Sequence, residues 1–379
     1  MLPTSDRPTQ PGKAATFDRR AAFRLAFVAL PVMAAFAVPS INSAAASETP
    51  TIDIIDAVSR TVDDRTSLVP GTYKPDTSTT GVPDGTVLAQ VNGDIVVTAP
   101  NTLIDAREVF GFIRVNANNT HVTRTRVHGR GTGFVQSALI LIAPGVTGTV
   151  IEDCEIACDN PQYWQNGIAG SDFTARRCDM HDTIDAFDVD AGNVLIESCY
   201  IHELTFRSDD KDHANDKFHP YWTHNDGVQI KGGTNTTIRG CNFSTYVSLQ
   251  SGTTPTDRLH DLQSGWNNYG ASITCSPDKG EITGLLVELN WFDGGDTNFQ
   301  DNYSPSAAFT LGTMRYNRFG NDQHVYPGTK DSRYQIRFAA GITIDGLQTN
   351  YWDPKSATVP AANRGKPFSM GYQNGVRSP

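Results

Sequence analysis

Charged residues and helical patterns are scarce in this sequence. Asp, Glu, Lys and Arg make up only 19% of the 379 residues, and neither heptads nor long amphipathic stretches occur. Acidic residues outnumber basic ones and give a formal net charge of −10, whereas a protein that binds nucleic acid needs a basic stripe. The composition therefore argues against a nucleic-acid partner and gives no sign of a coiled coil.

The apolar run near the N-terminus is too short to cross a membrane. It covers residues 25–38, whereas a membrane span needs roughly 20 apolar residues. The run follows Arg19 and Arg20 and precedes three alanines at positions 44–46, which is typical of an export signal with a small-residue cleavage site. The paired arginines, with Phe23 behind them, resemble a twin-arginine leader. We expect residues 1–46 to be this signal, and the mature protein to be bacterial, secreted and free of the membrane.

A four-residue pattern recurs along the chain and ends on a small side chain in most copies. The first full copy is Ile-Glu-Asp-Cys at residues 151–154. The last position of the pattern is occupied in turn by Thr125, Cys154, Cys178, Cys199, Cys241, Asn290 and Asn317. The shortest intervals, 21 and 24 residues, are typical of a solenoid with one coil per repeat. Apolar residues alternate within each copy, which indicates strands and not helices.

Small residues in one frame predict that their side chains stack from coil to coil. This pattern resembles the internal ladders of the right-handed parallel β-helix proteins of the pectate lyase superfamily, over roughly residues 90–350. The resemblance implies an all-β fold, a right-handed parallel β-helix (solenoid) with long loop insertions and capped ends. We expect residues 47–88 to be a linker and N-terminal flank over the first coil, 89–350 the β-helix, and 351–379 a tail over the last coil. The same fold carries lyases, hydrolases and non-catalytic adhesins, so the chemistry stays open.

Cysteines are few, and four of the six share the ladder frame. An exported protein would normally pair them as disulfides. Neighbouring coils lie about 4.8 Å apart, within the reach of a disulfide, but side chains in register point in parallel and the bridge needs them skewed. We therefore expect a reduced, buried stack. A metal site on these thiols is not expected, because the coils spread them along an axis.

Aspartates gather on two neighbouring coils, just before Cys199 and Cys241. Aligning the two cysteines, with one extra residue in the turn at 232–234, places three pairs side by side: Asp185 with Asp226, Asp188 with Gln229, and Asp190 with Lys231. The alternation of the strands puts the last two pairs on the outer face of one sheet. Asp is a poor strand residue, and neighbouring carboxylates repel one another unless a cation or a set of sugar hydroxyls binds them. The cluster therefore favours a site over a solvated strand face.

Two intervals of the ladder are long, and their extra residues must leave the coils as loops. The first insertion, residues 207–223, emerges between the two aspartate-bearing coils. Long loops on a rigid scaffold are where function usually lies. We expect this insertion to form one side of a groove over the aspartates. The expected substrate-binding side chains are Lys217, His219, Tyr221 and Trp222 from the insertion, and Gln229 from the strand beneath it.

The first function that fits this groove is cleavage of an acidic polysaccharide by β-elimination. As the resemblance implies, Asp185, Asp188 and Asp190 would hold Ca²⁺, which takes several oxygen ligands. Lys231 or His224 would then take the α-proton of a uronate, and the other catalytic candidates are Asp226 and Arg207. No arginine is certain to occupy the base position that such lyases often use.

Two other functions stay open. His-Asn-Asp-Gly at residues 224–227 resembles the Asn-x-Asp-Gly stretch of polygalacturonase-like hydrolases, in which paired carboxylates cleave the glycosidic bond, although the next coil lacks the second Asp pair. A glycan-binding adhesin without catalysis is the other alternative, with loop tryptophans stacking on sugars. A polysaccharide is the expected partner in all three cases, and a monomer is the expected assembly.

Overall fold

The protein is described here by a computed structural model that covers residues 65–130, 136–162, 165–207, 223–249, 270–295, 297–303, 308–321, 334–339, 341–368 and 372–374. All of them belong to the second of two compact units, Ile52–Pro379. They are strands and turns almost throughout, and helical backbone within these ranges occurs at residues 65–66 and in a short 3-10 turn, η1 (Leu347–Thr349). No helix among the described residues has the length and apolar character needed to cross a membrane.

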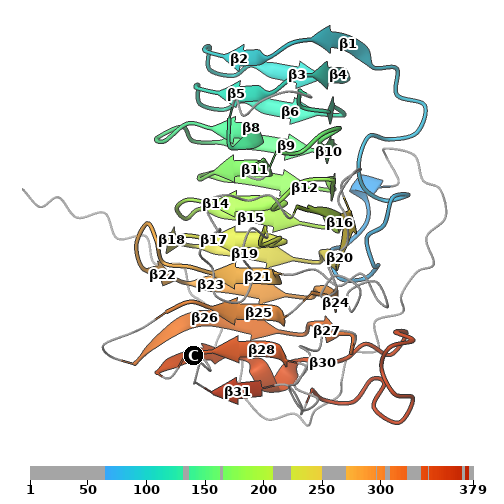
Figure 1. Cartoon of the computed structure of the whole chain (residues 1–379), viewed down its shortest axis with the longest axis vertical. Helices are drawn as coiled ribbons and strands as arrows, with labels where there is room; N and C mark the ends of the chain where they lie inside the picture. The colour runs from blue at the N-terminus through green and yellow to red at the C-terminus, as the bar shows by residue number, and fades with distance from the viewer. Residues whose placement is uncertain are drawn as a thin grey trace, which may run out of the picture. The chain divides into compact units, whose positions relative to one another are not determined.

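The strands stack into three long parallel sheets and one short sheet (Figure 1). Sheet A has ten strands: β1 (Ala89–Asn92), β4 (Arg107–Phe110), β7 (Arg126–Val127), β10 (Glu155–Ala157), β13 (Asp179–His181), β16 (Tyr200–Phe206), β20 (Asn242–Leu249), β24 (Trp291–Gly294), β27 (Arg318–Phe319) and β30 (Tyr351–Trp352). Sheet B also has ten: β2 (Ile95–Val97), β5 (Ile113–Val115), β8 (Ala138–Ile142), β11 (Asn166–Gly170), β14 (Phe187–Val189), β17 (Val228–Ile230), β21 (Ala271–Cys275), β25 (Thr297–Asp301), β28 (Tyr334–Phe338) and β31 (Tyr372–Asn374).

Sheet C has nine strands: β3 (Leu103–Asp105), β6 (His121–Thr123), β9 (Thr149–Glu152), β12 (Phe173–Arg176), β15 (Val194–Glu197), β19 (Thr236–Arg239), β23 (Leu285–Glu288), β26 (Phe309–Arg315) and β29 (Ile342–Asp345). The short sheet pairs β18 (Gly233–Thr234) with β22 (Ile282–Thr283). One coil visits sheets C, A and B in turn, as β12, β13 and β14 do, and then returns to sheet C at β15. The fold is a right-handed parallel β-helix, which confirms the prediction from the repeat.

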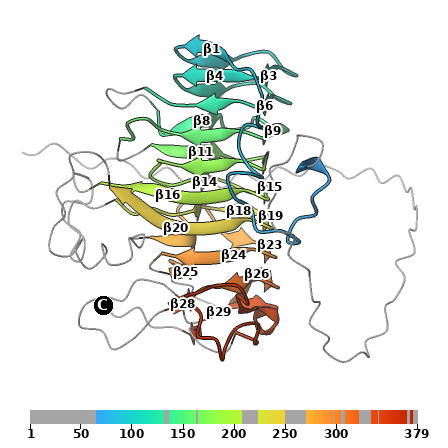
Figure 2. The same ribbon diagram turned by 90° about the vertical axis from the view of Figure 1, so that its right-hand side faces the viewer.

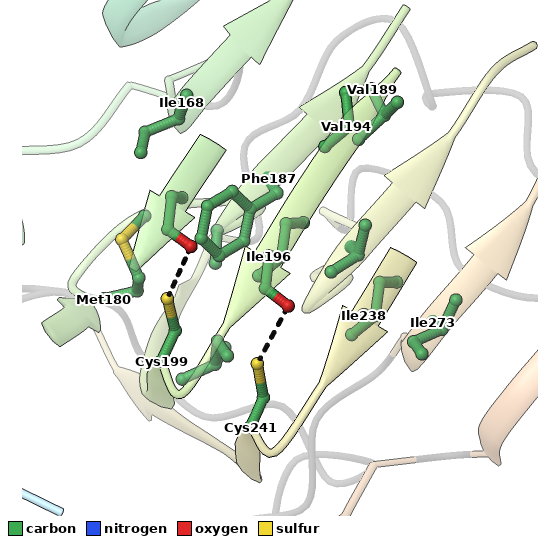
Figure 3. Packing of buried hydrophobic residues seen from close by; sticks show 14 of the residues in the cluster. Ile168, Met180, Phe187, Val189, Val194, Ile196, Cys199, Ile238, Cys241 and Ile273 are labelled. Carbon is green, nitrogen blue, oxygen red and sulfur yellow. Dashed lines mark hydrogen bonds between the residues drawn. The ribbon is translucent and has the colours of Figure 1, made fainter. Parts of the chain in front are cut away.

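Apolar side chains fill the space between the three sheets. On sheet B, Ile168, Phe187, Val228 and Ile273 are in register on four successive coils, and all are fully buried. Figure 3 shows Phe187 and Ile196 facing each other from sheets B and C across this interior. Burying one such side chain contributes about 1.5–3 kcal/mol. Stacking in register therefore gives every coil the same apolar contacts with the next.

The corner between sheets C and A has the same backbone in most coils. The residue just before the ladder position is left-handed, although most L side chains avoid that conformation at a cost of about 1–2 kcal/mol. These residues, with their φ angles, are Arg124 (46°), Asp153 (53°), Arg177 (48°), Ser198 (55°), Gly240 (63°), Leu289 (61°) and Tyr316 (55°). The recurrence of one strained turn explains why the tetrad keeps its length while other parts of the coil vary.

The ladder side chains that follow these turns are buried. All six cysteines are free and buried, which confirms the expected reduced stack for the four in the frame. The Cys199 thiol lies 3.8 Å from the Ala175 carbonyl of the preceding coil, and the Cys241 thiol lies 3.6 Å from that of Ile196, as the dashed lines of Figure 3 show. The thiols thus contact carbonyl oxygens of the coil before them.

Asparagines continue the ladder with stronger hydrogen bonds. Asn290 Oδ1 accepts the Cys241 N–H (2.8 Å), Asn317 Oδ1 accepts the Asn290 N–H (3.0 Å), and Asn350 Oδ1 accepts the Asn317 N–H (2.9 Å). Each side-chain amide also donates to a carbonyl, such as Asn317 Nδ2 to Val287 O at 3.0 Å. Asn350 extends the ladder one coil beyond the sequence prediction.

Opposite charges alternate down the outer face of sheet C. The register aligns six side chains on successive coils: Glu152, Arg176, Glu197, Arg239, Glu288 and Arg315. Glu197 pairs with both of its neighbours, at 3.1 Å from Arg176 and 2.5 Å from Arg239. Exposed pairs contribute about 0–1 kcal/mol each, so this stripe adds modest stability but opposes misaligned coils.

The segment before the first strand lies along the side of the β-helix, as Figure 2 shows. We expected residues 47–88 to cover the first coil, but the described part, from residue 65, contacts coils from the middle of the stack to β27 near its C-terminal end. Its hydrogen bonds join Arg318 Nη2 to Gly71 O (3.1 Å), Asn242 Nδ2 to Pro75 O (2.8 Å) and Gly81 N to Arg177 O (2.9 Å). Gly240 is required there, because a Cβ at this position would lie 2.8 Å from Pro70 Cβ.

The last coils extend beyond the boundary expected at residue 350. β30 continues sheet A and β31 continues sheet B, so the β-helix includes part of the expected tail. The Phe368 ring stacks on Phe319 at 4.6 Å and meets Trp352 edge-on at 5.0 Å. These aromatic contacts cover the apolar interior near its C-terminal end.

The asparagine ladder predicts a large effect of one buried substitution. Asn317→Ala removes the partners of Asn290 N–H and Val287 O, and each unsatisfied buried group costs roughly 1–3 kcal/mol. We expect a clear loss of stability, measured as the midpoint of urea unfolding followed by circular dichroism. Asn92→Ala is the control, because Asn92 is exposed and its Oδ1 accepts a hydrogen bond from the Gln90 side chain. Equal midpoints for the two variants would show that the ladder is not a stabilising element.

Candidate functional site

A row of polar side chains follows the outer face of sheet B. The register pairs Asp188 on β14 with Gln229 on β17, and Gln229 with Thr274 on β21. It continues to Gln300 on β25 and Arg337 on β28. The core-facing residues on either side of Asp188 are Phe187 and Val189, so the alternation of the strand turns Asp188 outward.

Asp188 is buried although it faces outward. Its relative exposure is 5%, and its Oδ2 atom accepts hydrogen bonds from Lys231 Nζ (2.6 Å) and Asn166 Nδ2 (3.2 Å). Its Oδ1 atom is buried and has no hydrogen-bond partner among the described residues. Burial raises the pKa of Asp188 against the opposing attraction of Lys231. An outward position therefore does not make this carboxylate a solvated one, and one of its oxygens is unused.

Lys231 keeps its proton in this environment. Burial disfavours its charge, but the attraction and hydrogen bond of Asp188, with Asp190 and Asp185 further away, raise the pKa of Lys231 above its usual value. A lysine with a raised pKa is a poor proton acceptor at neutral pH. The arrangement favours Lys231 as a fixed positive charge.

Asp185 and Asp226 lie at the start of their strands, where a second ladder runs. Asn166 Oδ1 accepts the Asp185 N–H (3.3 Å), Asp185 Oδ1 accepts the Asp226 N–H (2.8 Å), and Asp226 Oδ1 accepts the Ala271 N–H (2.7 Å). The Asp226 Oδ1 atom also accepts a hydrogen bond from the Thr274 hydroxyl at 2.9 Å. Both carboxylates therefore hold the backbone of the next coil.

The carboxyl group of Asp185 has a strongly perturbed pKa. Burial and then the charge of Asp226 raise its pKa well above the ordinary value, and the Asp226 N–H only partly offsets them. Two neighbouring carboxyls in a dry site share protons, because both cannot ionise at low cost. This pair can hold a proton at a pH where ordinary aspartates have lost theirs.

The third predicted metal ligand, Asp190, forms an ion pair with Lys279. Lys279 was missed from the sequence, and its backbone N–H donates to the Lys231 carbonyl at 2.8 Å. The sequence does contain a signal for Lys279. Ile273 and Cys275 alternate as Val228 and Ile230 do, which indicates the next strand of the same sheet, and Lys279 lies in the turn after it. Asn166 was also missed, although it lies on β11, the strand of sheet B one coil before β14.

The other predicted site residues are only partly within the described structure. Lys217, His219, Tyr221 and Trp222 lie outside the described residues. Arg207 is half-buried, and its Nη1 atom donates to the Pro161 carbonyl at 2.6 Å. His224 is half-buried next to Asn225, whose amide donates to the carbonyls of Ile184 (2.9 Å) and Thr205 (2.8 Å). On sheet B the structure brings Asp188, Gln229 and Lys231 together.

Comparison with known proteins adds no relative. No family model matches the chain, and no curated protein or solved structure was found to be similar to it.

The perturbed pKa of Asp185 predicts a pH-dependent effect of Asp185→Asn. The folded chain holds a proton that the unfolded chain releases above about pH 4, so wild-type stability falls as pH rises toward the raised pKa, by up to about 1.4 kcal/mol per unit. Asparagine keeps the acceptor for the Asp226 N–H, as Asn166 does one coil earlier. The variant should gain stability over wild type with rising pH, measured by urea unfolding with a chelator present.

Asp105→Asn is the control, because its effect on stability should depend on pH in the opposite direction. The hydrogen bond from Arg124 lowers the pKa of Asp105, so the carboxylate contributes stability above its unfolded pKa and loses it as pH falls through the folded value. The difference between this variant and wild type should shrink toward low pH. A difference between Asp185→Asn and wild type that does not change with pH would refute the assignment of a buried proton to this pair.

Proposed function

We propose that the protein is an exported carbohydrate-active enzyme that cleaves an acidic polysaccharide by β-elimination on the outer face of sheet B. The observation that carries the proposal is the buried, unpartnered Oδ1 atom of Asp188 beside the Lys231 ammonium group. A buried carboxylate oxygen without a partner is costly, and such costs are retained where a ligand supplies the partner. The parallel β-helix and the resemblance to the pectate lyase superfamily support a polysaccharide as that ligand.

The charges of the site suit a uronate. Lys231 and Lys279 on the next coil, each also paired with an aspartate, would neutralise the substrate carboxylate, and this would acidify the adjacent α-proton. Because Lys231 keeps its own proton, His224 is the remaining candidate of the two proposed acceptors. His224 would take the α-proton, the electron pair would form the new C=C bond, and the glycosidic oxygen would leave and take a proton from water.

Calcium fits part of this site. The free Oδ1 of Asp188 is a suitable ligand, while Asp185 Oδ1 already binds a backbone N–H and Asp190 is paired with Lys279. When bound by Asp188, Asp190 and Asp185, the ion would add positive charge for the same uronate carboxylate. The lysines supply that charge from the chain itself.

Hydrolysis is the second candidate, because Asp185 and Asp226 are paired carboxyls of which Asp185 has a raised pKa. A glycosidase needs one protonated and one ionised carboxyl. However, each of these side chains uses an oxygen to hold the backbone of the next coil, whereas Asp188 has an oxygen to spare. The Asp188–Lys231 pair is therefore the better centre.

The test is a panel of acidic polysaccharides followed at the ultraviolet absorbance of the unsaturated product, with calcium and with a chelator. A lyase produces absorbance, a hydrolase produces reducing ends without absorbance, and a binding protein produces neither. We expect absorbance, and we expect Lys231→Gln to lower kcat about 100-fold, the usual effect of removing one charge-stabilising donor.

The matched control is Lys74→Gln. Lys74 also forms a part-buried ion pair, with Asp293 at 2.8 Å, but lies against sheet A. It should keep wild-type activity, and both variants should keep the circular dichroism spectrum of the β-helix. Reducing ends without absorbance, or full activity in Lys231→Gln, would contradict the proposed reaction.

A further inference from the structure

A second cluster of titratable side chains lies on the outer face of sheet A, away from the sheet B row. Asp179 and His181 belong to β13, and His202 belongs to β16 on the next coil. One possible ligand atom from each residue lies within 4.8 Å of the other two. Asp179 and His202 are buried, and the two imidazole rings stack at 5.0 Å between centroids.

The two histidines are built into the fold in the same way. Each is followed by an acidic residue in the left-handed conformation, Asp182 with φ 50° and Glu203 with φ 45°. That conformation is costly for a side chain other than glycine, and such strain concentrates at functional sites. Here it turns each carboxylate back onto its own histidine, at 2.8 Å from His181 Nδ1 and 3.1 Å from His202 Nδ1.

This orientation leaves the Nε2 atoms for another partner. A carboxylate that accepts the Nδ1 proton fixes the ring and directs the Nε2 lone pair to a metal, which is the usual arrangement around metal-binding histidines. His202 Nε2 lies 2.9 Å from Asp179 Oδ1, and His181 Nε2 lies 3.8 Å from Glu155 Oε1. Two imidazole nitrogens thus converge with two carboxylates from three successive coils.

We propose that Asp179, His181 and His202 bind a divalent d-block cation such as Zn²⁺, with Glu155, whose Oε1 atom lies 3.8 Å from His181 Nε2, as a further oxygen ligand. Imidazole nitrogens with a carboxylate suit zinc and its neighbours in the first row, whereas calcium and magnesium prefer oxygen alone. Tetrahedral bonds of about 2.0–2.2 Å place ligand atoms about 3.3–3.6 Å apart, so donors that lie within 4.8 Å of one another need to approach by at most about 1.5 Å. The ion binds the Nε2 lone pairs, takes the place of any proton that His202 Nε2 shares with Asp179, and links neighbouring coils.

The experiment uses the untagged full chain, freed of metal by a chelator and titrated with Zn²⁺ by calorimetry. One site per chain is expected. His202→Gln and His181→Gln should each weaken Zn²⁺ binding at least 100-fold, and Glu203→Gln, which changes only the residue that orients His202, about 10–100-fold. Circular dichroism confirms that each variant is folded, and Glu203→Gln keeps the test valid if a histidine variant does not fold.

The matched control is His128→Gln. His128 lies on the same face, between Asp159 (2.9 Å) and Glu108 (3.3 Å), and stacks on Phe110, but no second histidine of the described ranges joins it. This variant should bind Zn²⁺ as wild type does. Co²⁺ should give the visible spectrum of nitrogen and oxygen ligands without a thiolate charge-transfer band.

Three results would overturn the proposal. They are the absence of stoichiometric binding, equal affinities in the His202→Gln and His128→Gln variants, and a thiolate band, which would assign the metal to the cysteines. None of these readouts depends on enzymatic activity, so the metal site stands or falls separately from the proposed reaction.

Discussion

Register between neighbouring coils is the constraint on which the rest of this structure depends. A slip of one residue would turn every core side chain outward, so each coil must be held at one point along its length. The corner between sheets C and A does this with a left-handed residue followed by a buried side chain, which at Asn290 and Asn317 hydrogen-bonds the neighbouring coil. Asn350, which follows the 3-10 turn η1, makes the same hydrogen bond. Cysteines occupy the same frame in earlier coils and rely on burial and on contacts with carbonyl oxygens.

Fixed register explains how the polar residues of sheet B come together. Asp188 and Lys231 are 43 residues apart in sequence, yet their charged atoms are 2.6 Å apart because β14 and β17 are neighbours in the stack. The strands on either side of the insertion, β14 and β17, are in register. The same rule builds the cluster on sheet A, where Asp179, His181 and His202 meet. Each face of the β-helix can therefore collect side chains from successive coils independently of the others.

The sequence was sufficient to predict the fold and the residues that lie side by side on neighbouring strands, because both follow from the spacing of the ladder residues. The side-by-side positions of Asp185 and Asp226, and of Asp188 and Gln229, were predicted in this way. Burial was not predicted: alternation shows which face a side chain takes, but not that Asn166 and Lys231 enclose Asp188. Asn350 was missed although Trp352 follows it two residues later, as an apolar residue follows the other ladder positions. The paths of residues 65–81 and of the chain after 350 depend on contacts between distant segments, which no local pattern encodes.

Native-state amide hydrogen exchange tests the central claim most directly. If the buried ladder holds the register, the N–H groups of Cys241, Asn290 and Asn317 should exchange only when the whole β-helix unfolds, because each donates to a buried side chain of the next coil. The N–H groups of exposed turns, such as Gly145, should exchange much sooner. Exchange of the three ladder N–H groups at the rate of Gly145 would show that this corner opens locally and that register is held elsewhere.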